Sequence, residues 1–189
     1  MLIDFENLSE LNKYKYMSNS IFPRPIAWIS SQDEVVNLAP FSYFAPISSE
    51  PPLIIVSIVT KDDGSQKDTF ANIIKTKKCV INLAHAELLG DLINSAKDLP
   101  KTQSECEVFG IEMSYIIDGF APMVKNAKCA LFCELYDVLE INETYKPLIL
   151  QIKSLFINDN CVNEKNHFEL DNIGRAGMNF LGNCEIMKA

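Results

Sequence analysis

Three neighbouring residues, Lys67, Asp68 and Thr69, bring a cation, a carboxylate and a hydroxyl to the start of a predicted helix. The first backbone N–H groups of a helix lack partners within it, and the helix dipole is positive there, so helix starts bind anions. The segment from Lys61 to Lys78 has five lysines and three aspartates, a charge of +2, in a chain of net charge -8. A local positive segment in an acidic protein indicates a phosphate site. A capped surface helix with solvated lysines is the alternative interpretation.

A second group of candidates lies between two apolar runs of the segment from Ile21 to Ser57. Its loop mixes hydrogen-bonding Asn37 and Ser42 with the aromatic residues Tyr43 and Phe44. This mixture is typical of a pocket for a flat, partly polar ligand. For Phe44 a purely structural role, filling the interior of a barrel, is equally well supported.

Motifs for several other chemistries are absent from the sequence. It has no GxGxxG after a first strand, no GxxxxGK[ST] and no GxSxG, which argues against a Rossmann nucleotide site, a P-loop and an α/β-hydrolase nucleophile. The two histidines, His85 and His167, have no metal-ligand spacing, so we expect no metal site. None of the six cysteines forms a CxxC pair, which favours reduced core thiols in a cytoplasmic protein.

Composition favours a single globular domain over residues 1–189, with 48% hydrophobic residues. The net charge of -8 argues against nucleic-acid binding. We find no signal peptide and no apolar run of transmembrane length, so we expect a cytoplasmic protein without a membrane partner. Arg24 and Arg175 are the only arginines. Each could recognise phosphate or carboxylate with its planar fork, or could be a helix-end charge or a surface ion pair.

The predicted elements place these candidates at strand ends and at one helix start. Strands are predicted from β-branched and apolar runs at residues 26–30, 35–39, 51–60, 79–84, 113–117, 128–141 and 148–158. Helices are predicted at residues 6–16, 67–78 and 87–97, the second capped by Asp68 or Thr69. Loops are predicted at residues 40–52, 98–110 and from 161 onward. The first two strands should form a hairpin, and the whole pattern predicts an antiparallel barrel with helices on its edges.

Five motifs in this order resemble the flavin reductase-like family, and flavoredoxin-type proteins in particular. They are RPIAWIS, NLAPFSYF, PPLIIVSI, KDTFANI and GRAGMNF, and the resemblance spans residues 14–183. It implies a mainly β fold, an antiparallel, Greek-key-like split β-barrel with peripheral α-helices. It also implies non-covalent FMN binding in a homodimer, with the flavin near the subunit interface.

The resemblance assigns roles residue by residue. By this resemblance, the residues that line the flavin or its phosphate are Arg24, Pro25, Ile26 and Ala27. Hydrogen bonds to the ribityl chain and ring edge fall to Asn37, Ala39 and Ser42, and enclosure of the isoalloxazine to Tyr43 and Phe44. Ser57 lies at the flavin-facing strand end, while Lys67, Asp68 and Thr69 grip the phosphate with support from Asn72. Arg175 matches a family arginine with a cofactor or interface role.

The implied activity is hydride transfer from NADH or NADPH to flavin N5, followed by electron transfer to free flavin or a redox protein partner. We expect no catalytic side chain, because the redox chemistry belongs to the cofactor. Two departures from the family pattern, Leu150-Gln151-Ile152 and Phe180, leave donor and acceptor open. An FMN-binding electron carrier without NAD(P)H oxidation is one alternative, and a barrel interaction domain without flavin is another.

Overall fold

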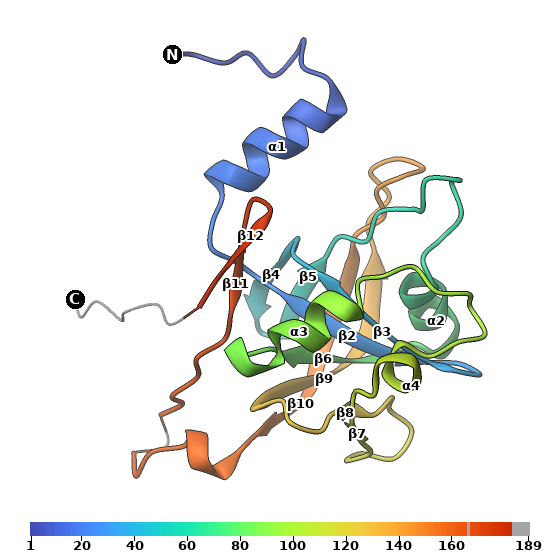
Figure 1. The fold of residues 1–189 in the computed structure, drawn as a ribbon, viewed down its shortest axis with the longest axis vertical. Coiled ribbons are helices and arrows are strands. Elements are labelled where there is room, and N and C mark those ends of the chain that lie inside the picture. The colour runs from blue at the N-terminus through green and yellow to red at the C-terminus, as the bar shows by residue number, and fades with distance from the viewer. Residues whose placement is uncertain (166, 183–189) are drawn as a thin grey trace.

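A seven-stranded antiparallel sheet forms the body of the protein in the computed structural model, which describes residues 1–165 and 167–182 (Figure 1). The strand order is β3-β2-β6-β9-β10-β5-β4. In that order the strands are Val36–Phe41, Ala27–Gln32, Lys78–Leu83, Cys129–Val138, Leu148–Ile157, Pro52–Val56 and Phe44–Ser49.

Two hydrophobic clusters pack on opposite faces of this sheet, because successive strand residues point to opposite sides. Ala27, Ile29 and Ile81 belong to one cluster, which is completed by Phe70 and Ile73 of α2 (Asp68–Thr76). The alternate residues of β2, β6 and β9 belong to the second cluster, which the helices after β6 cover. The central strands β2 and β6 are therefore buried on both faces, which explains their nearly continuous apolar sequences.

The remaining elements surround the sheet. The helices are α1 (Glu10–Ser20), η1 (Ala86–Leu88), α3 (Leu89–Asn94), α4 (Glu105–Phe109) and η2 (Asp159–Cys161). A three-stranded sheet joins β1 (Arg24–Pro25), β11 (Gly174–Ala176) and β12 (Asn179–Leu181), and β7 (Met113–Ser114) pairs with β8 (Met123–Val124). Figure 1 shows α1 projecting away from the main sheet, beside the β11–β12 hairpin.

Several predicted elements are confirmed. The first two predicted strands are β2 and β3, which pair as a hairpin. The predicted helix at 67–78 is α2, and the strand after it is β6. The two long strands at 128–141 and 148–158 are β9 and β10, which pair with each other.

The predicted loop at residues 40–52 is wrong, because it contains all of β4. This strand lies at the edge of the sheet and pairs only with β5, with a register shift between Pro46 and Ser48. Proline lacks the N–H that a central strand must donate, but an edge strand tolerates it. A proline-rich segment that looks like a loop can therefore extend a sheet at its edge.

Other boundaries also differ from the predictions. The first helix begins four residues later than predicted, at Glu10, where the Ser9 hydroxyl accepts from the Asn12 N–H. The predicted helix at 87–97 is divided between η1 and α3, and the strand predicted at 113–117 is only the two residues of β7. The connection at 98–110 includes α4, and the tail after residue 161 includes η2, β11 and β12. Of these short elements, β11 depends on a partner far away in the chain, because it pairs with β1.

Candidate functional site

A cavity of about 840 Å³ opens where β3, the start of α2 and α1 meet. Pockets that enclose small ligands and cofactors have volumes of roughly 300–1,000 Å³. Strand β3 contributes Asn37 and Ala39, and the β3–β4 turn contributes Ser42 and Tyr43. The cavity therefore has a helix start at one part of its wall and an aromatic turn at another.

The start of α2 carries no side-chain cap. Its N-cap residue is Lys67, in an extended conformation, and not Asp68 or Thr69 as predicted. Asp68 instead pairs with Lys61 over 3.1 Å. Lys67 has no ion-pair partner within the part of the chain that the structure describes. The first N–H groups of α2 and the Lys67 ammonium are therefore left to bind an anion in the cavity.

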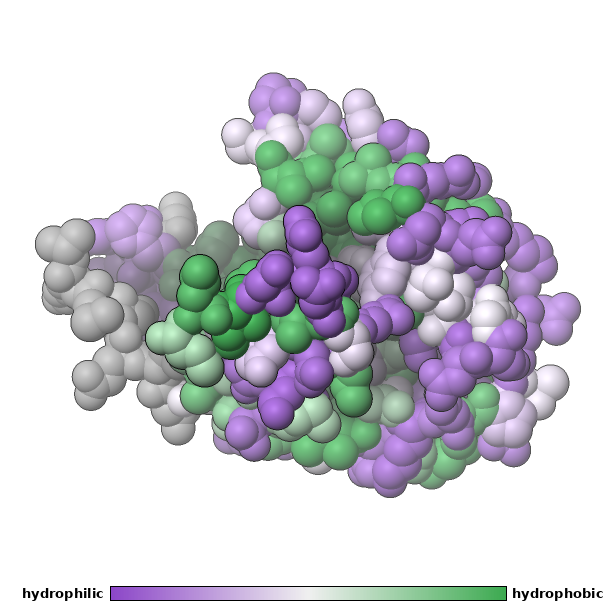
Figure 2. Space-filling view, turned by 90° about the horizontal axis from the view of Figure 1, so that it is seen from above, coloured by the Kyte–Doolittle hydropathy of each residue, from purple (hydrophilic) through white to green (hydrophobic). Residues whose placement is uncertain are grey.

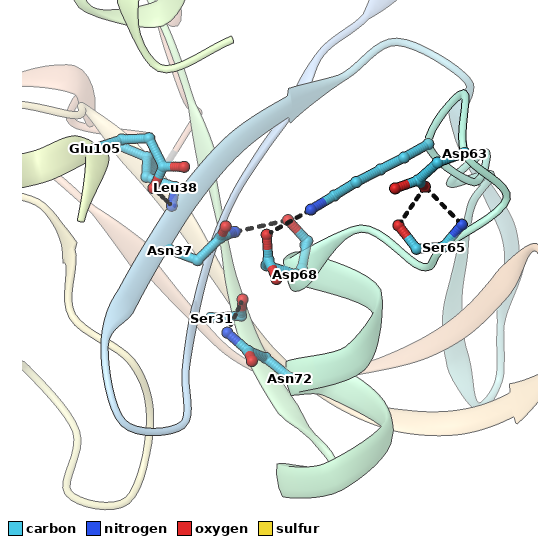
Figure 3. A network of polar contacts seen from close by, with 10 residues as sticks. Ser31, Asn37, Leu38, Asp63, Ser65, Asp68, Asn72 and Glu105 are labelled. Carbon is cyan, nitrogen blue, oxygen red and sulfur yellow. Dashed lines mark hydrogen bonds and ion pairs between the residues drawn. The ribbon is translucent and has the colours of Figure 1, made fainter. Parts of the chain in front are cut away.

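Two amide side chains connect α2 to the β2–β3 hairpin by hydrogen bonds (Figure 3), in addition to the ion pair of Lys75 with Asp33. The Asn37 amide donates to Thr69 Oγ1 over 2.7 Å, and the Asn72 amide donates to Ser31 Oγ over 3.3 Å. Because Thr69 Oγ1 accepts from Asn37, its own hydroxyl hydrogen remains available for a ligand. Thr69 lines the cavity, so this donor joins the helix N–H groups at the same place.

Glu105 is a functional candidate that the sequence analysis missed. Its Oε2 accepts the backbone N–H of Leu38 over 2.9 Å, and the residue is only 8% exposed (Figure 3). Burial raises the pKa of its carboxyl, and Asp68 raises it further, whereas the bond from Leu38 and the charge of Lys61 lower it. Glu105 lines both the main cavity and a neighbouring cavity of about 360 Å³. No local sequence pattern identified Glu105 as a site residue, because the groups around its carboxyl belong to β3 and α2, which are distant in the chain.

Helix α1 forms another wall that sequence reasoning did not place at the site. Its residues Glu10, Lys13, Tyr14 and Met17 line the cavity. The Tyr14 ring lies 6.1 Å from the Tyr43 ring, centroid to centroid. Figure 2, seen from the end of the molecule at which α1 lies in Figure 1, shows separate groups of hydrophobic residues among hydrophilic ones.

Residues 17–169 match the family described as "Flavin reductase like domain". The chain belongs to the flavin reductase-like family. Component B of nitrilotriacetate monooxygenase from Bacillus cereus is 28% identical and superposes with a TM-score of 0.91, covering 100% of this chain and 98% of that one. A split barrel domain from Shewanella frigidimarina is 21% identical, with a TM-score of 0.84 and coverage of 100% and 98%. Flavoredoxin of Desulfovibrio vulgaris is 13% identical, with a TM-score of 0.80 and coverage of 100% and 97%.

These similarities confirm the predicted fold class, a mainly β split barrel with peripheral helices. They also confirm the family to which the sequence motifs pointed. Family membership supports a flavin-related oxidoreductase and a flavin cofactor.

The structure brings more than half of the predicted flavin residues together at the main cavity. Those that line it are Asn37, Ala39, Ser42, Tyr43, Ser57, Lys67, Asp68 and Thr69. Asn72 lines the smaller neighbouring cavity. Six predicted flavin residues line neither cavity: Arg24, Pro25, Ile26, Ala27, Phe44 and Arg175.

Packing explains the residues outside the lining. Ile26 and Ala27 are buried in the hydrophobic clusters on the two faces of the sheet. Phe44 packs against the cluster that contains Ala27, as the structural alternative for this residue anticipated. Arg24 and Arg175 lie opposite each other in the β1–β11 pair. The Arg175 guanidinium lies over the Phe180 ring, 4.4 Å from its centroid, and the Arg175 Nε–H donates to the Gly177 carbonyl.

Other chemistries gain no support from the described residues. No cluster of three or more His, Cys, Asp or Glu side chains suited to a metal ion occurs among them. Five cysteines are free and buried, and burial raises the pKa of the Cys79 thiol to about 12 and that of Cys106 to about 11. Such thiols are poor nucleophiles at neutral pH. Cys184 lies outside the described residues. Within the described ranges, every helix is too short or too polar to cross a membrane.

Proposed function

We propose that this protein is an FMN-binding oxidoreductase that accepts electrons from NADH or NADPH and passes them to free flavin or to a partner protein. The observation that carries the proposal is the start of α2, which has no side-chain cap and whose residues Lys67 and Thr69 line the cavity of about 840 Å³. Membership of the flavin reductase-like family supports the same assignment.

The donor set at the start of α2 fits the phosphate of FMN. Lys67 supplies a cation, Thr69 a hydroxyl donor and the first turn of α2 its free N–H groups. The Lys61–Asp68 ion pair limits repulsion between the Asp68 carboxylate and a bound anion. In this proposal Asn72 supports the phosphate turn indirectly, through its bond to Ser31 in the hairpin.

The rest of the cavity fits the ribityl chain and the ring system. Asn37 lies beside the start of α2, Ala39 lies further along β3, and Ser42 lies in the β3–β4 turn. These three residues would bind the ribityl hydroxyls and the ring edge. Tyr43 would enclose the ring, with Ser57 beside it on the wall. The Ser57 N–H donates to the Tyr43 carbonyl over 2.9 Å, which holds these two residues together.

A bound flavin would supply the hydride and electron chemistry itself. The residues of this chain would bind it, orient it and exclude water from it. We therefore assign no side chain the role of a proton-transfer catalyst.

The two departures from the family pattern lie away from the cavity. Leu150 is fully buried in β10, where it pairs with Ile54 and Leu135. Phe180 lies under the Arg175 guanidinium. Neither residue lines the cavity, so the departures are compatible with flavin binding.

The second candidate function is an FMN-binding electron carrier that does not oxidise nicotinamides. The structural similarity to flavoredoxin favours it as the alternative. An absorption spectrum of the purified protein with added FMN, followed by anaerobic addition of NADH and then NADPH, separates the candidates. A bound flavin band that bleaches identifies the reductase and its donor, whereas a bound band that persists identifies the carrier. No bound flavin band, even with excess FMN, would overturn both candidates.

We also propose a homodimer with the flavin site near the subunit interface. Helix α1 supports it: this helix contributes to the cavity wall and leaves Leu11 74% exposed, and Ile21 and Phe22 just beyond it are more than half exposed. Exposed apolar side chains on a projecting helix and just after it are compatible with an interaction surface.

A further inference from the structure

Arg24 is an unusual arginine, because its guanidinium is buried without an acidic partner. The residue is only 6% exposed, and no carboxylate of the described residues lies within ion-pair distance. Its Nη1 donates to the carbonyls of Ser18 and Ile21, over 2.5 Å and 2.9 Å. Its Nε and Nη2 are buried and have no hydrogen-bond partner in the described part of the chain. Buried charges in proteins are normally paired, so something else must compensate this one.

The positive charge of Arg24 is compensated by the carbonyl end of α1 and by an aromatic ring, both of them uncharged. The carbonyls of Ser18 and Ile21 belong to the C-terminal end of α1, where the helix dipole is negative and stabilises a cation. The Arg24 guanidinium also lies 5.7 Å from the centroid of the Tyr43 ring, within the range of a cation–π interaction. Tyr43 lines the main cavity and Arg24 does not. The guanidinium therefore contacts Tyr43 from outside the cavity.

Helix α1 has few other attachments to the barrel. The Tyr145 hydroxyl donates to Glu10 over 2.8 Å, and the Gly177 N–H donates to the Ser18 carbonyl over 3.0 Å. Ring contact between Tyr14 and Tyr43 adds a third attachment. Figure 1 shows that most of α1 extends beyond the sheet. An element with so few buried contacts opens easily unless a strong interaction fixes it.

We infer that Arg24 is a positioning residue that fastens α1 and Tyr43 together as two walls of the flavin cavity, and so controls how long the flavin stays bound. The inference rests on the proposed function for the identity of its ligand. The contacts that support it are made between residues of this protein and involve no ligand. One guanidinium contacts the end of α1 and the Tyr43 ring at the same time. Its loss would free both walls and leave the phosphate site at α2 intact.

The experiment compares Arg24→Met, Arg24→Lys and, as control, Lys128→Met. Lys128 pairs with Asp171 over 2.9 Å and lines neither cavity, so its loss removes a cation that does not contact α1 or Tyr43. The first readout is the FMN dissociation rate after rapid dilution. The second is trypsin cleavage of the flavin-free protein after Lys13 and Lys15, both within α1.

For Arg24→Met we expect FMN to dissociate about tenfold faster, because loss of contacts acts mainly on dissociation. Cleavage within α1 should accelerate as well, while Lys128→Met should match the wild type in both readouts. Arg24→Lys keeps the charge and one donor group but loses the planar fork, so it should lie between Met and wild type.

Wild-type dissociation and cleavage rates in Arg24→Met would overturn the inference, and so would equal effects of Arg24→Met and Lys128→Met. If Arg24→Met does not fold, Arg24→Lys decides: faster dissociation and cleavage support the inference, and wild-type rates overturn it. Absence of FMN binding by the wild type would instead refute the proposed function and the control of flavin release. Cleavage would then still show whether Arg24 fastens α1.

Discussion

The Asn37 side chain donates a hydrogen bond to Thr69 Oγ1 over 2.7 Å, across 32 residues of sequence. This bond joins β3 to the first turn of α2, and the bond from Asn72 to Ser31 joins the same helix to β2. The proposed phosphate site is therefore held at a constant distance from the strand that would carry the ribityl chain. Specific binding of FMN requires such a constant spacing, because its phosphate and ring lie at opposite ends of one ligand.

Replacing Thr69 by valine should weaken FMN binding more than riboflavin binding. The substitution keeps the shape of the side chain but removes the hydroxyl donor next to the phosphate. It also removes the acceptor of the Asn37 amide, which affects both flavins equally. A hydrogen bond to a charged group contributes about 1.5–3 kcal/mol, so the FMN dissociation constant should rise about tenfold or more. Fluorescence titration with both flavins measures this. A similar loss of affinity for riboflavin, which has no phosphate, would contradict the assignment.

Replacing Lys67 by alanine should also weaken FMN binding, with little change in the free energy of unfolding. Lys67 makes no side-chain cap on α2, so the fold does not depend on its ammonium. Lys75→Ala is the matched control, because Lys75 lies on the same helix and pairs with Asp33 over 2.6 Å at an exposed position. An unchanged FMN dissociation constant in Lys67→Ala, or an equal rise in both variants, would refute a specific phosphate contact.

The stability of the protein should depend on the ionisation of Glu105. Its pKa is raised in the folded state, first by burial, so the fold binds this proton more tightly than the unfolded chain does. The contribution of Glu105 is then fully present at low pH and is lost as pH rises above the ordinary glutamate value of 4.5. Glu105→Gln keeps an acceptor for the Leu38 N–H and removes the charge, so its advantage over wild type should grow with pH.

Thermal unfolding of wild type and Glu105→Gln from acidic to neutral pH measures this difference. At neutral pH we expect the variant to unfold at a temperature higher by about 2–4 °C. Glu107→Gln is the control, because Glu107 lies on the same helix and is exposed. A difference in unfolding temperature that stays constant with pH would show that the carboxylate does not titrate as proposed.

The purified protein should be a dimer by light scattering, with FMN bound. Leu11→Asp places a charge on the exposed surface of α1 and should shift the mass toward the monomer. Val108→Asp, at a half-exposed position on α4, should leave the dimer intact. A monomeric mass of the FMN-loaded wild type would exclude the homodimer.

Sequence patterns predicted the elements whose cause is local. The β-branched and apolar residues of β2, β6 and β9 identify buried strands wherever they lie in the sheet. The amphipathic sequence of α2 identifies its helix and its positively charged segment. Lys67 and Thr69 are adjacent to this helix start in the chain, so their common location followed directly.

The turn at Ser42 and Tyr43 was also predictable as part of the site, because its residue types alone suit a flat ligand. The edge strand β4 was not predictable, since prolines and serines are not residues that favour a β-strand. It forms because β5 offers it backbone partners. The short strands β11 and β12 are stabilised in the same way, because they pair with each other and β11 also pairs with β1.

The sequence by itself therefore determined the family, the main strands and a helix start suited to an anion. Only the tertiary structure decided that Glu105 and α1 reach the same cavity, and that Arg24 stands behind Tyr43 and not in the lining. The reason is physical. The main strands, α2 and its helix-end charge depend largely on neighbours in the chain. Burial, pKa and the pairing of a guanidinium depend on groups that packing brings together from distant segments.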